Sequence, residues 1–249
     1  MISGTSPIGS GTDAVLWITA LIMIIGSLIF TFRSFTARAE VKHYFYASAL
    51  IPLIAATLYT LMASGYGTLN QYGHLFFFGR YIDWVFTTPL LLLDLGLVAL
   101  PKNFPGRLSL IATMMGADVY MIVTGFVATA IRSDFRWAFY GASCAGFLAV
   151  LYFILVRLTP EAARRRDDVR QLYRMLSMTL IVLWFCYPIV WVLGSEGFGV
   201  ISVLAETILY AILDILAKVG YGFILLSRPA TLAGADETPA SISKVAAQA

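Results

Sequence analysis

The sequence predicts an all-α integral membrane protein built as a bundle of seven transmembrane helices. Of its 249 residues, 59% are hydrophobic and only 12% are charged, whereas soluble domains carry about 25% charged residues. The apolar residues fall into seven blocks, each long enough for the roughly 20 helical residues that cross a hydrocarbon core. These blocks are continuously apolar rather than alternating, which disfavours a β-barrel and leaves helices as the way to satisfy the backbone in lipid.

The seven helices are expected at residues 13–33, 43–65, 75–99, 107–131, 136–158, 174–194 and 200–227. The connections at 101–106 and 194–199 are short and contain Pro or Gly, so consecutive helices should be antiparallel neighbours. We expect one membrane domain at 1–228, followed by a disordered cytoplasmic tail at 229–249 that is rich in Ala, Ser and Thr. Cys144 and Cys186 fall within helices, where we interpret them as small packing residues rather than a disulfide.

The distribution of basic residues predicts the orientation. If the N-terminus is extracellular, one side of the membrane collects thirteen of the seventeen basic residues, namely Arg33, Arg38, Lys42, Lys102, Arg107, Arg157, Arg164, Arg165, Arg166, Arg170, Arg174, Arg228 and Lys244. The other side collects Arg132 and Arg136. The richer side should be cytoplasmic, which places the C-terminus in the cytoplasm of a multi-pass protein of the cell membrane. The net charge of +3 reflects this anchoring and gives no reason to propose nucleic-acid binding.

Several charged residues lie where lipid disfavours them. An ionisable side chain near the bilayer centre costs on the order of 2.5–3.5 kcal/mol on insertion scales. The apolar blocks nevertheless contain Arg80, Asp83, Asp94, Asp118, Asp214 and Lys218, with Glu206 in the outer part of the last block. Any one of these could simply bond a neighbouring helix, but the whole set indicates a functional site.

The third block carries its polar residues on one helical face. Arg80, Asp83, Thr87 and Asp94 follow one another in steps of three, four and seven residues, which align at 3.6 residues per turn. Asp83 and Asp94 are therefore about 16 Å apart along the axis. Two carboxylates at that separation cannot form one acid–base dyad, but they can act as two stations on either side of a central group.

The last block supplies a candidate for that central group. Asp214 and Lys218 are four residues apart on one face, which is the spacing of an ordinary helical ion pair. A buried lysine is also the residue that forms Schiff bases. A protonated Schiff base would need carboxylate counter-ions, and Asp83 and Asp214 could supply them.

Four stretches resemble the corresponding helices of microbial rhodopsins. They are RYIDWVFTTPLLLLD at 80–94, DILAKVGYG at 214–222, WFCYPIVW at 184–191, and the second-helix segment at 52–59. The resemblance covers all seven helices in order. It implies that Lys218 carries all-trans retinal as a protonated Schiff base, with Asp83 as primary counter-ion and proton acceptor and Asp214 as second counter-ion.

The resemblance also assigns the other stations. Asp94 matches the cytoplasmic proton donor, and Thr87 matches the hydroxyl between the two stations. This Asp-Thr-Asp combination is typical of outward proton pumps of the bacteriorhodopsin type. Chloride pumps lack an acid at the position of Asp83, sodium pumps carry Asn there, and many sensory members lack a carboxylic donor at the position of Asp94. On the exit side, Arg80 resembles the mobile arginine, while Glu196 and Glu206 resemble the paired acids of the proton-release group, although a loop acid such as Glu196 is more often solvated.

The resemblance implies a retinal slot lined by aromatic and small residues. Its expected members are Trp84, Thr88, Met121, Gly125, Trp137, Trp184, Tyr187 and Trp191, with Tyr59 beside the second counter-ion. Without Lys218, such an aromatic stripe would be interpreted as core packing. Asp118 is expected to form a neutral interhelical hydrogen bond with Thr88. Four residues of the fifth helix differ from the commonest residues near the retinal ring, namely Tyr140, Gly141, Ser143 and Cys144.

The sequence therefore predicts a light-driven outward proton pump rather than an enzyme. The expected partners are retinal, protons, membrane lipids and further copies of the chain in a homo-oligomer. A sensory photoreceptor that signals through a partner protein is the main alternative. A seven-helix transporter or receptor without a chromophore is a second alternative, which would not explain Lys218 with two counter-ions. His43 and His74 are interpreted as surface residues.

Overall fold

The computed structural model describes residues 9–71, 74–131 and 133–236. Within them, seven helical spans are long and apolar enough to cross a membrane, which confirms the seven-helix prediction. The spans are α1 (Ser10–Thr36), η1 (Ala39–Val41) with α2 (Lys42–Ala63), α3 (Phe78–Ala99), α4 (Arg107–Ala130), α5 (Phe135–Tyr152) with η2 (Phe153–Leu158) and α6 (Thr159–Ala163), α7 (Asp167–Leu193), and α8 (Val203–Ile215) with η3 (Leu216–Gly220) and α9 (Tyr221–Leu226).

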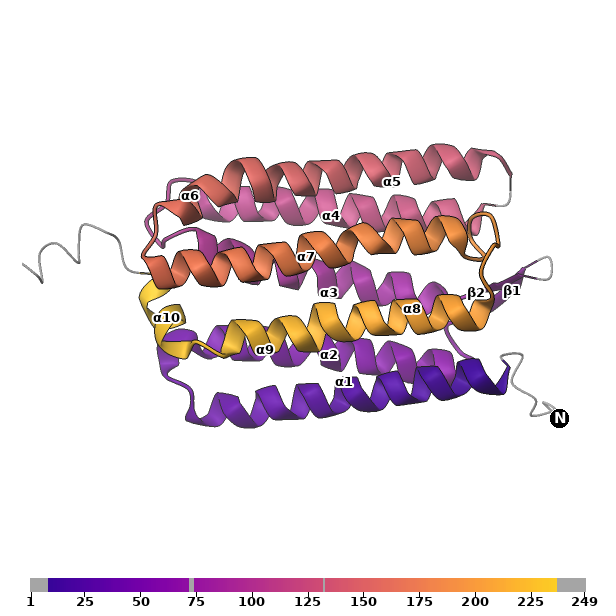
Figure 1. Ribbon diagram of the computed structural model, residues 1–249, viewed down its shortest axis with the longest axis horizontal. Helices are drawn as coiled ribbons and strands as arrows, with labels where there is room; N and C mark the ends of the chain where they lie inside the picture. The colour runs from indigo at the N-terminus through magenta and orange to yellow at the C-terminus, as the bar shows by residue number, and fades with distance from the viewer. Residues whose placement is uncertain (1–8, 72–73, 132, 237–249) are drawn as a thin grey trace, which may run out of the picture.

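The spans lie side by side along one long axis (Figure 1). The start of α1 and the short C-terminal helix α10 (Pro229–Ala233) lie at opposite ends of the bundle, as an odd number of antiparallel spans requires. The described basic residues of the predicted cytoplasmic set lie in or just after the last turn of α1, after α3, α6 and α9, within η2, or in the first turns of α2, α4 and α7. They therefore gather at the α10 end. Arg132 and Lys244 lie outside the described residues, as does the side chain of His74.

The third helix begins later than predicted. Residues 75–77 were expected to be helical, but β1 (Leu69–Gln71) and β2 (His74–Phe76) form an antiparallel hairpin before α3, with Leu69 opposite Phe76. Strand pairing satisfies backbone groups at the end of the bundle as well as a helix would. Strands of three residues are too short to show a hydrophobic period, so the sequence pattern does not reveal them.

The sixth span is longer than predicted and begins at Asp167 rather than near residue 174. Asp167 and Asp168 occupy its first turn, where acidic side chains interact favourably with the helix dipole. The charged residues at 164–174 weaken the apolar signal, which is why the pattern alone places the start two turns too late.

The segment after α9 also differs from the prediction of disorder. Residues 229–236 form α10 and the 3₁₀ turn η4 (Gly234–Asp236), with Thr231, Leu232 and Ala235 buried. Pro229 is at the start of α10, where its fixed backbone angle suits a first helical turn. The rest of the expected tail, 237–249, lies outside the described residues.

The third and seventh spans are the most enclosed. About two thirds of the α3 window is buried (67%), against 28% for α4 and for the fifth span. Large apolar side chains such as Phe32, Phe86 and Leu148 are exposed on the outside of the bundle, as expected for a surface in contact with lipid. Cys144 and Cys186 are both free, which confirms the prediction of no disulfide between them.

The contact between α4 and α5 depends on a glycine. A Cβ added to Gly146 would lie 2.9 Å from Met121 Cβ, 3.0 Å from its Cα and 3.1 Å from its backbone nitrogen. Backbone atoms cannot rotate away as a side-chain end can, so the two helices meet here at the closest distance that their main chains allow.

We therefore expect Gly146→Ala to lower the midpoint of thermal unfolding in detergent, with an overpacking cost of about 1–3 kcal/mol. Gly141→Ala on the same helix is the matched control, because no atom lies within 4 Å of the Cβ it would add. Equal midpoints for the two variants would show that α4 and α5 are not in close contact at Gly146.

Candidate functional site

A buried cation with two carboxylates lies at the centre of the bundle. Lys218 Nζ is 2.7 Å from Asp83 Oδ2 and 3.0 Å from Asp214 Oδ1. Lys218 is 2% exposed and both aspartates are fully enclosed. Helical spacing predicted the pairing with Asp214, and the fold brings Asp83, the other expected counter-ion, to Lys218 from α3. Lys218 lies in η3, a π-helical turn, and such turns are frequently found at functional sites.

The two carboxylates differ in how completely they are hydrogen-bonded. Asp214 accepts hydrogen bonds from Tyr59 Oη at 2.8 Å, Tyr187 Oη at 2.7 Å and Trp84 Nε1 at 3.1 Å, in addition to its contact with Lys218. Asp83 Oδ1 has no hydrogen-bond partner among the described residues. Asp214 is therefore held as a saturated carboxylate, whereas Asp83 retains an oxygen with free lone pairs.

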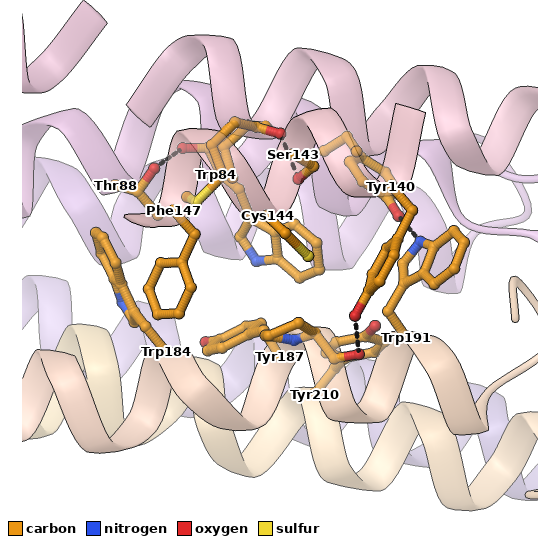
Figure 2. Close-up of a pocket in the computed structure, with 15 residues that line it drawn as sticks. Trp84, Thr88, Tyr140, Ser143, Cys144, Phe147, Trp184, Tyr187, Trp191 and Tyr210 are labelled. Carbon is orange, nitrogen blue, oxygen red and sulfur yellow. Dashed lines mark hydrogen bonds between the residues drawn. The ribbon is translucent and has the colours of Figure 1, made fainter. Parts of the chain in front are cut away.

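An apolar pocket adjoins this centre. Its walls are Tyr81, Trp84, Thr88, Met121, Ile122, Gly125, Tyr140, Ser143, Cys144, Phe147, Trp184, Tyr187, Pro188, Trp191 and Tyr210. Trp184 and Phe147 stand at one end, and Tyr140 and Trp191 stand at the other (Figure 2). Lys218 does not itself line the pocket, but Trp84 and Tyr187 do, and both donate to the same Asp214.

Seven of the eight predicted slot residues line this pocket, and Trp137 does not. Trp137 lies behind the wall, with its ring centroid 5.8 Å from that of Trp191 and 5.9 Å from that of Tyr140. Tyr59 does not line the pocket but contacts Asp214, the second counter-ion beside which it was expected. Five further lining residues were not predicted, namely Tyr81, Ile122, Phe147, Pro188 and Tyr210. Their spacing in the sequence does not distinguish these residues from ordinary core residues, because their position in the pocket depends on which helix faces lie opposite one another.

The second carboxyl of α3 is isolated. Asp94 is buried, and neither of its oxygens has a hydrogen-bond partner among the described residues. The hydroxyl of Ser48 on α2 is also buried without a hydrogen bond among them. Asp118 instead meets Thr88 as predicted, with Thr88 Oγ1 2.7 Å from Asp118 Oδ2.

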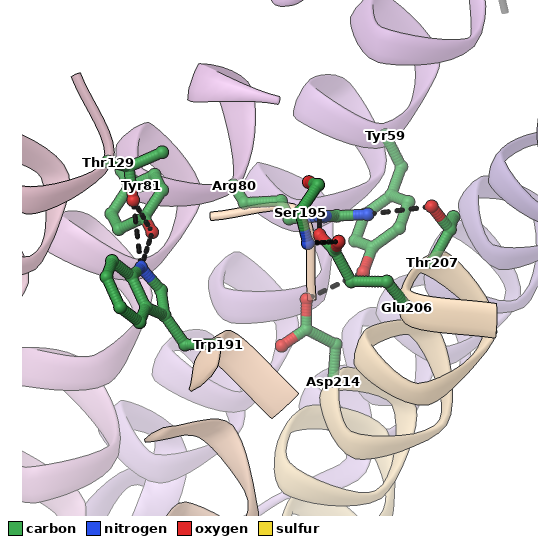
Figure 3. Close-up of polar contacts among 9 residues, drawn as sticks. All are labelled: Tyr59, Arg80, Tyr81, Thr129, Trp191, Ser195, Glu206, Thr207 and Asp214. Atoms are coloured by element: carbon green, nitrogen blue, oxygen red, sulfur yellow. Dashed lines mark hydrogen bonds and ion pairs between the residues drawn. The ribbon is translucent and has the colours of Figure 1, made fainter. Parts of the chain in front are cut away.

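At the other end of α3, Arg80 contacts one acid and one hydroxyl of α8. Its guanidinium donates to Glu206 Oε1 at 2.8 Å and to Thr207 Oγ1 at 2.9 Å (Figure 3). Glu206 Oε2 also accepts the backbone N–H of Ser195 at 2.8 Å, which ties the loop after α7 to α8.

Glu196 lies in that same loop but is not a solvated surface acid. The side chain is 4% exposed, and its Oε2 has no hydrogen-bond partner among the described residues. Burial, together with the negative charge of nearby Glu206, raises the pKa of Glu196 well above its ordinary value, although the positive charge of Arg80 opposes the shift. The charge of Glu206 therefore affects the ionisation of Glu196.

Comparison with known proteins identifies the family. Residues 10–232 match the model for bacteriorhodopsin-like proteins. The chain belongs to this family. It is 37% identical to archaerhodopsin-2 from Halobacterium sp. (strain aus-2) over 246 residues, which cover 95% of this chain and 93% of that protein. The family membership confirms a multi-pass membrane protein that is an ion transporter rather than an enzyme.

Solved structures agree with this assignment. The thermophilic rhodopsin from Rubrobacter xylanophilus is 42% identical, with a TM-score of 0.87 over 90% of this chain and 99% of that one. The light-driven proton pump rhodopsin of Coccomyxa subellipsoidea is 38% identical, with a TM-score of 0.81 over 88% of this chain and 97% of that one. The bundle is therefore a rhodopsin fold.

The raised pKa of Glu196 can be tested by infrared titration. A raised pKa means that the protonated form survives to higher pH, so the C=O stretch of a protonated carboxyl should persist well above the range in which an exposed glutamate ionises. Glu196→Gln should remove this band, whereas Glu40→Gln, which alters an exposed acid, should not. Loss of the band at the pH of an ordinary glutamate would contradict the assignment.

Proposed function

We propose that this protein is a light-driven outward proton pump that carries all-trans retinal on Lys218. The observation that carries the proposal is the amine of Lys218, buried between Asp83 and Asp214 at the edge of an aromatic pocket. Membership of the bacteriorhodopsin-like family, whose members bind retinal, supports the same conclusion. So does the likeness to a rhodopsin described as a light-driven proton pump.

The residues present suit such a ligand. A flat, apolar polyene needs a narrow slot with aromatic walls, and rings from α3, α5, α7 and α8 provide those walls. A covalent link needs an amine, and Lys218 Nζ lies beside Asp214, which Trp84 and Tyr187 of the pocket also contact. When bound, retinal supplies light absorption and a light-driven change in the proton affinity at Nζ.

Asp83 is the better of the two carboxylates to accept the proton from Nζ. Its Oδ2 already contacts Nζ at 2.7 Å, and its Oδ1 has no donor that competes for the new proton. Asp214 is engaged by three neutral donors that stabilise its charged form. Asp83 is therefore the carboxylate that accepts the proton, while Asp214 serves as the second counter-charge.

Asp94 is suited to return a proton to Nζ from the other side. It lies about 16 Å along α3 from Asp83, in surroundings that include Leu91, Leu92 and Leu95. A carboxyl that is buried without a cation or hydrogen-bond donor is retained in its neutral form, since burial penalises the charge. A neutral acid at this point is a proton donor.

The exit path is provided by Arg80 and the two glutamates. Arg80 lies one turn before Asp83 on α3 and is bonded to Glu206. When Asp83 becomes neutral, one negative charge a helical turn from Arg80 is lost, so the positive charge of the guanidinium is less compensated on that side. Its attraction to Glu206 then favours release of the proton held by Glu196 and Glu206.

The direction of pumping follows from the orientation. The basic residues at the α10 end predict that this end is cytoplasmic, which places Asp94 on the inner side of Lys218 and the glutamates on the outer side. The alternative sensory function does not need a carboxylic acid at the position of Asp94. The pump is therefore the function that the site supports best.

Illumination of cells that express the protein with added retinal tests the proposal directly. A pH electrode should record acidification of the medium, and a protonophore should abolish it. Lys218→Ala should give a colourless, inactive protein, while Lys102→Ala in the α3–α4 loop should behave as wild type. A coloured protein without acidification would favour a photosensor, and the absence of any visible band would favour a transporter without a chromophore.

The acceptor role of Asp83 predicts a change of colour. Asp83→Asn removes the negative charge closest to Nζ, so the positive charge there is less stabilised in the dark and absorption should shift to the red. Pumping should cease, and acid titration of the wild type should reproduce the shift. Asp134→Asn, in a loop, is the control. If the Asp83 variant and wild type share one absorption maximum at neutral pH, Asp83 is not the counter-ion.

The donor role of Asp94 predicts a kinetic change without a change of colour. In Asp94→Asn, the return of a proton to Nζ must come from bulk solution, so flash photolysis should show it slowed by roughly 100-fold, as expected for loss of a positioned acid. The rate should then depend strongly on pH, and azide, a small diffusible acid, should restore it. Ser48→Ala should change the rate little, because Ser48 has no hydrogen bond to Asp94. A wild-type rate in Asp94→Asn would refute the donor assignment.

A further inference from the structure

Three buried polar groups meet behind one end of the pocket. Tyr81 of α3, Thr129 of α4 and Trp191 of α7 form a closed hydrogen-bonded triad (Figure 3). Tyr81 Oη is 2.6 Å from Thr129 Oγ1, and Trp191 Nε1 is 2.9 Å from Thr129 Oγ1 and 3.1 Å from Tyr81 Oη. None of the roles derived above uses this triad, and only one of its three members, Trp191, was predicted to have a role.

The direction of each hydrogen bond follows from the chemistry of the groups. The indole N–H of Trp191 can only donate, and it is shared between the two hydroxyl oxygens. Thr129 lies 3.2 Å from the carbonyl oxygen of Gly125, one turn earlier on α4, and donates its single proton there. Tyr81 then donates to Thr129. The Thr129 oxygen is thus the acceptor on which the donors of both aromatic residues converge.

The two aromatic members line the pocket, but Thr129 does not. Trp191 stacks on Tyr140 with ring centroids 4.5 Å apart and planes 19° apart. Tyr81 packs edge-on against Trp84 at 5.2 Å. The hydrogen bonds of the Trp191 indole oppose rotation about its side-chain torsions, and such a rotation would disturb its stacking on Tyr140. These hydrogen bonds therefore determine the shape of this pocket wall.

We infer that Thr129 is a positioning residue for the chromophore, which holds Tyr81 and Trp191 in one orientation and so fixes the pocket wall at the Tyr140 end. The inference rests on the proposed retinal site. Thr129 never touches the ligand in this assignment, and it acts only through the two rings.

The test compares two substitutions at one position. Thr129→Val keeps nearly the same shape but leaves the buried Tyr81 hydroxyl without its acceptor, whereas Thr129→Ser keeps the oxygen. With retinal bound, the Val variant should show a shifted absorption maximum and bleach about tenfold faster in hydroxylamine, the factor expected when a buried donor loses its partner. The Ser variant should resemble wild type. Thr113→Val is the matched control, since Thr113 makes the same one-turn bond on α4 at an exposed position.

A second measurement does not need the chromophore. In the protein without retinal, hydrogen exchange of the Trp191 indole N–H, identified by its absence in Trp191→Phe, should be slow in wild type and Thr129→Ser. It should be faster in Thr129→Val. If the Val variant does not fold, Thr129→Ala is used in its place, with the same expectations.

The outcomes separate this inference from the proposed function. Failure of the wild type to form a visible band with retinal would overturn the function, while slow indole exchange would still establish the triad. A wild-type band together with unchanged colour, bleaching and indole exchange in Thr129→Val would overturn the positioning role. A lower unfolding temperature in Thr129→Val without any of these changes would likewise overturn it, because Thr129 would then serve only helix packing.

Discussion

The arrangement of the bundle depends on one buried charge cluster, formed by Lys218 with Asp83 and Asp214. A single ionised side chain in this apolar interior would be strongly unfavourable, so the lysine and its carboxylates must remain together. This requirement holds α3 against the last span at a fixed position along the bundle axis. Tyr59, Trp84 and Tyr187 then converge on Asp214 because its remaining lone pairs need donors. The same contacts bring the pocket and the amine to one place.

The chemistry of the site follows from differences in how completely its carboxyl groups are hydrogen-bonded. Three carboxyls on two helices have different surroundings: Asp214 is saturated with donors, Asp83 has one free oxygen, and Asp94 has none of its oxygens bonded among the described residues. In the proposed pump, these differences would make Asp214 a fixed counter-charge, Asp83 an acceptor and Asp94 a donor without any difference in residue type. Glu196 and Glu206 lie beyond Arg80, toward the end of the bundle where α1 begins.

Much of the fold and of the candidate site could be predicted from the sequence, because the lipid core restricts which residues and which backbone structures can lie in it. Apolar blocks of sufficient length must be helices, so the seven spans were found with errors of a few residues at most ends. Charges within those blocks stand out, and Arg80, Asp83, Asp94, Asp214 and Lys218 were found for that reason. The errors fall at the ends, where the rule no longer applies: the hairpin at 69–76, the early start of α7 and the helical segment at 229–236.

The sequence by itself determined the number of spans, the polar face of α3 and the i,i+4 pairing of Asp214 with Lys218, because helical periodicity and the cost of charge in lipid are local properties. Only the tertiary structure decided which side chains meet across helices. It placed Trp137 behind the pocket wall, buried Glu196 beside Glu206, and joined Tyr81, Thr129 and Trp191. The physical reason is that hydrogen bonds between helices depend on their rotation and height relative to one another, which no spacing within a single helix encodes.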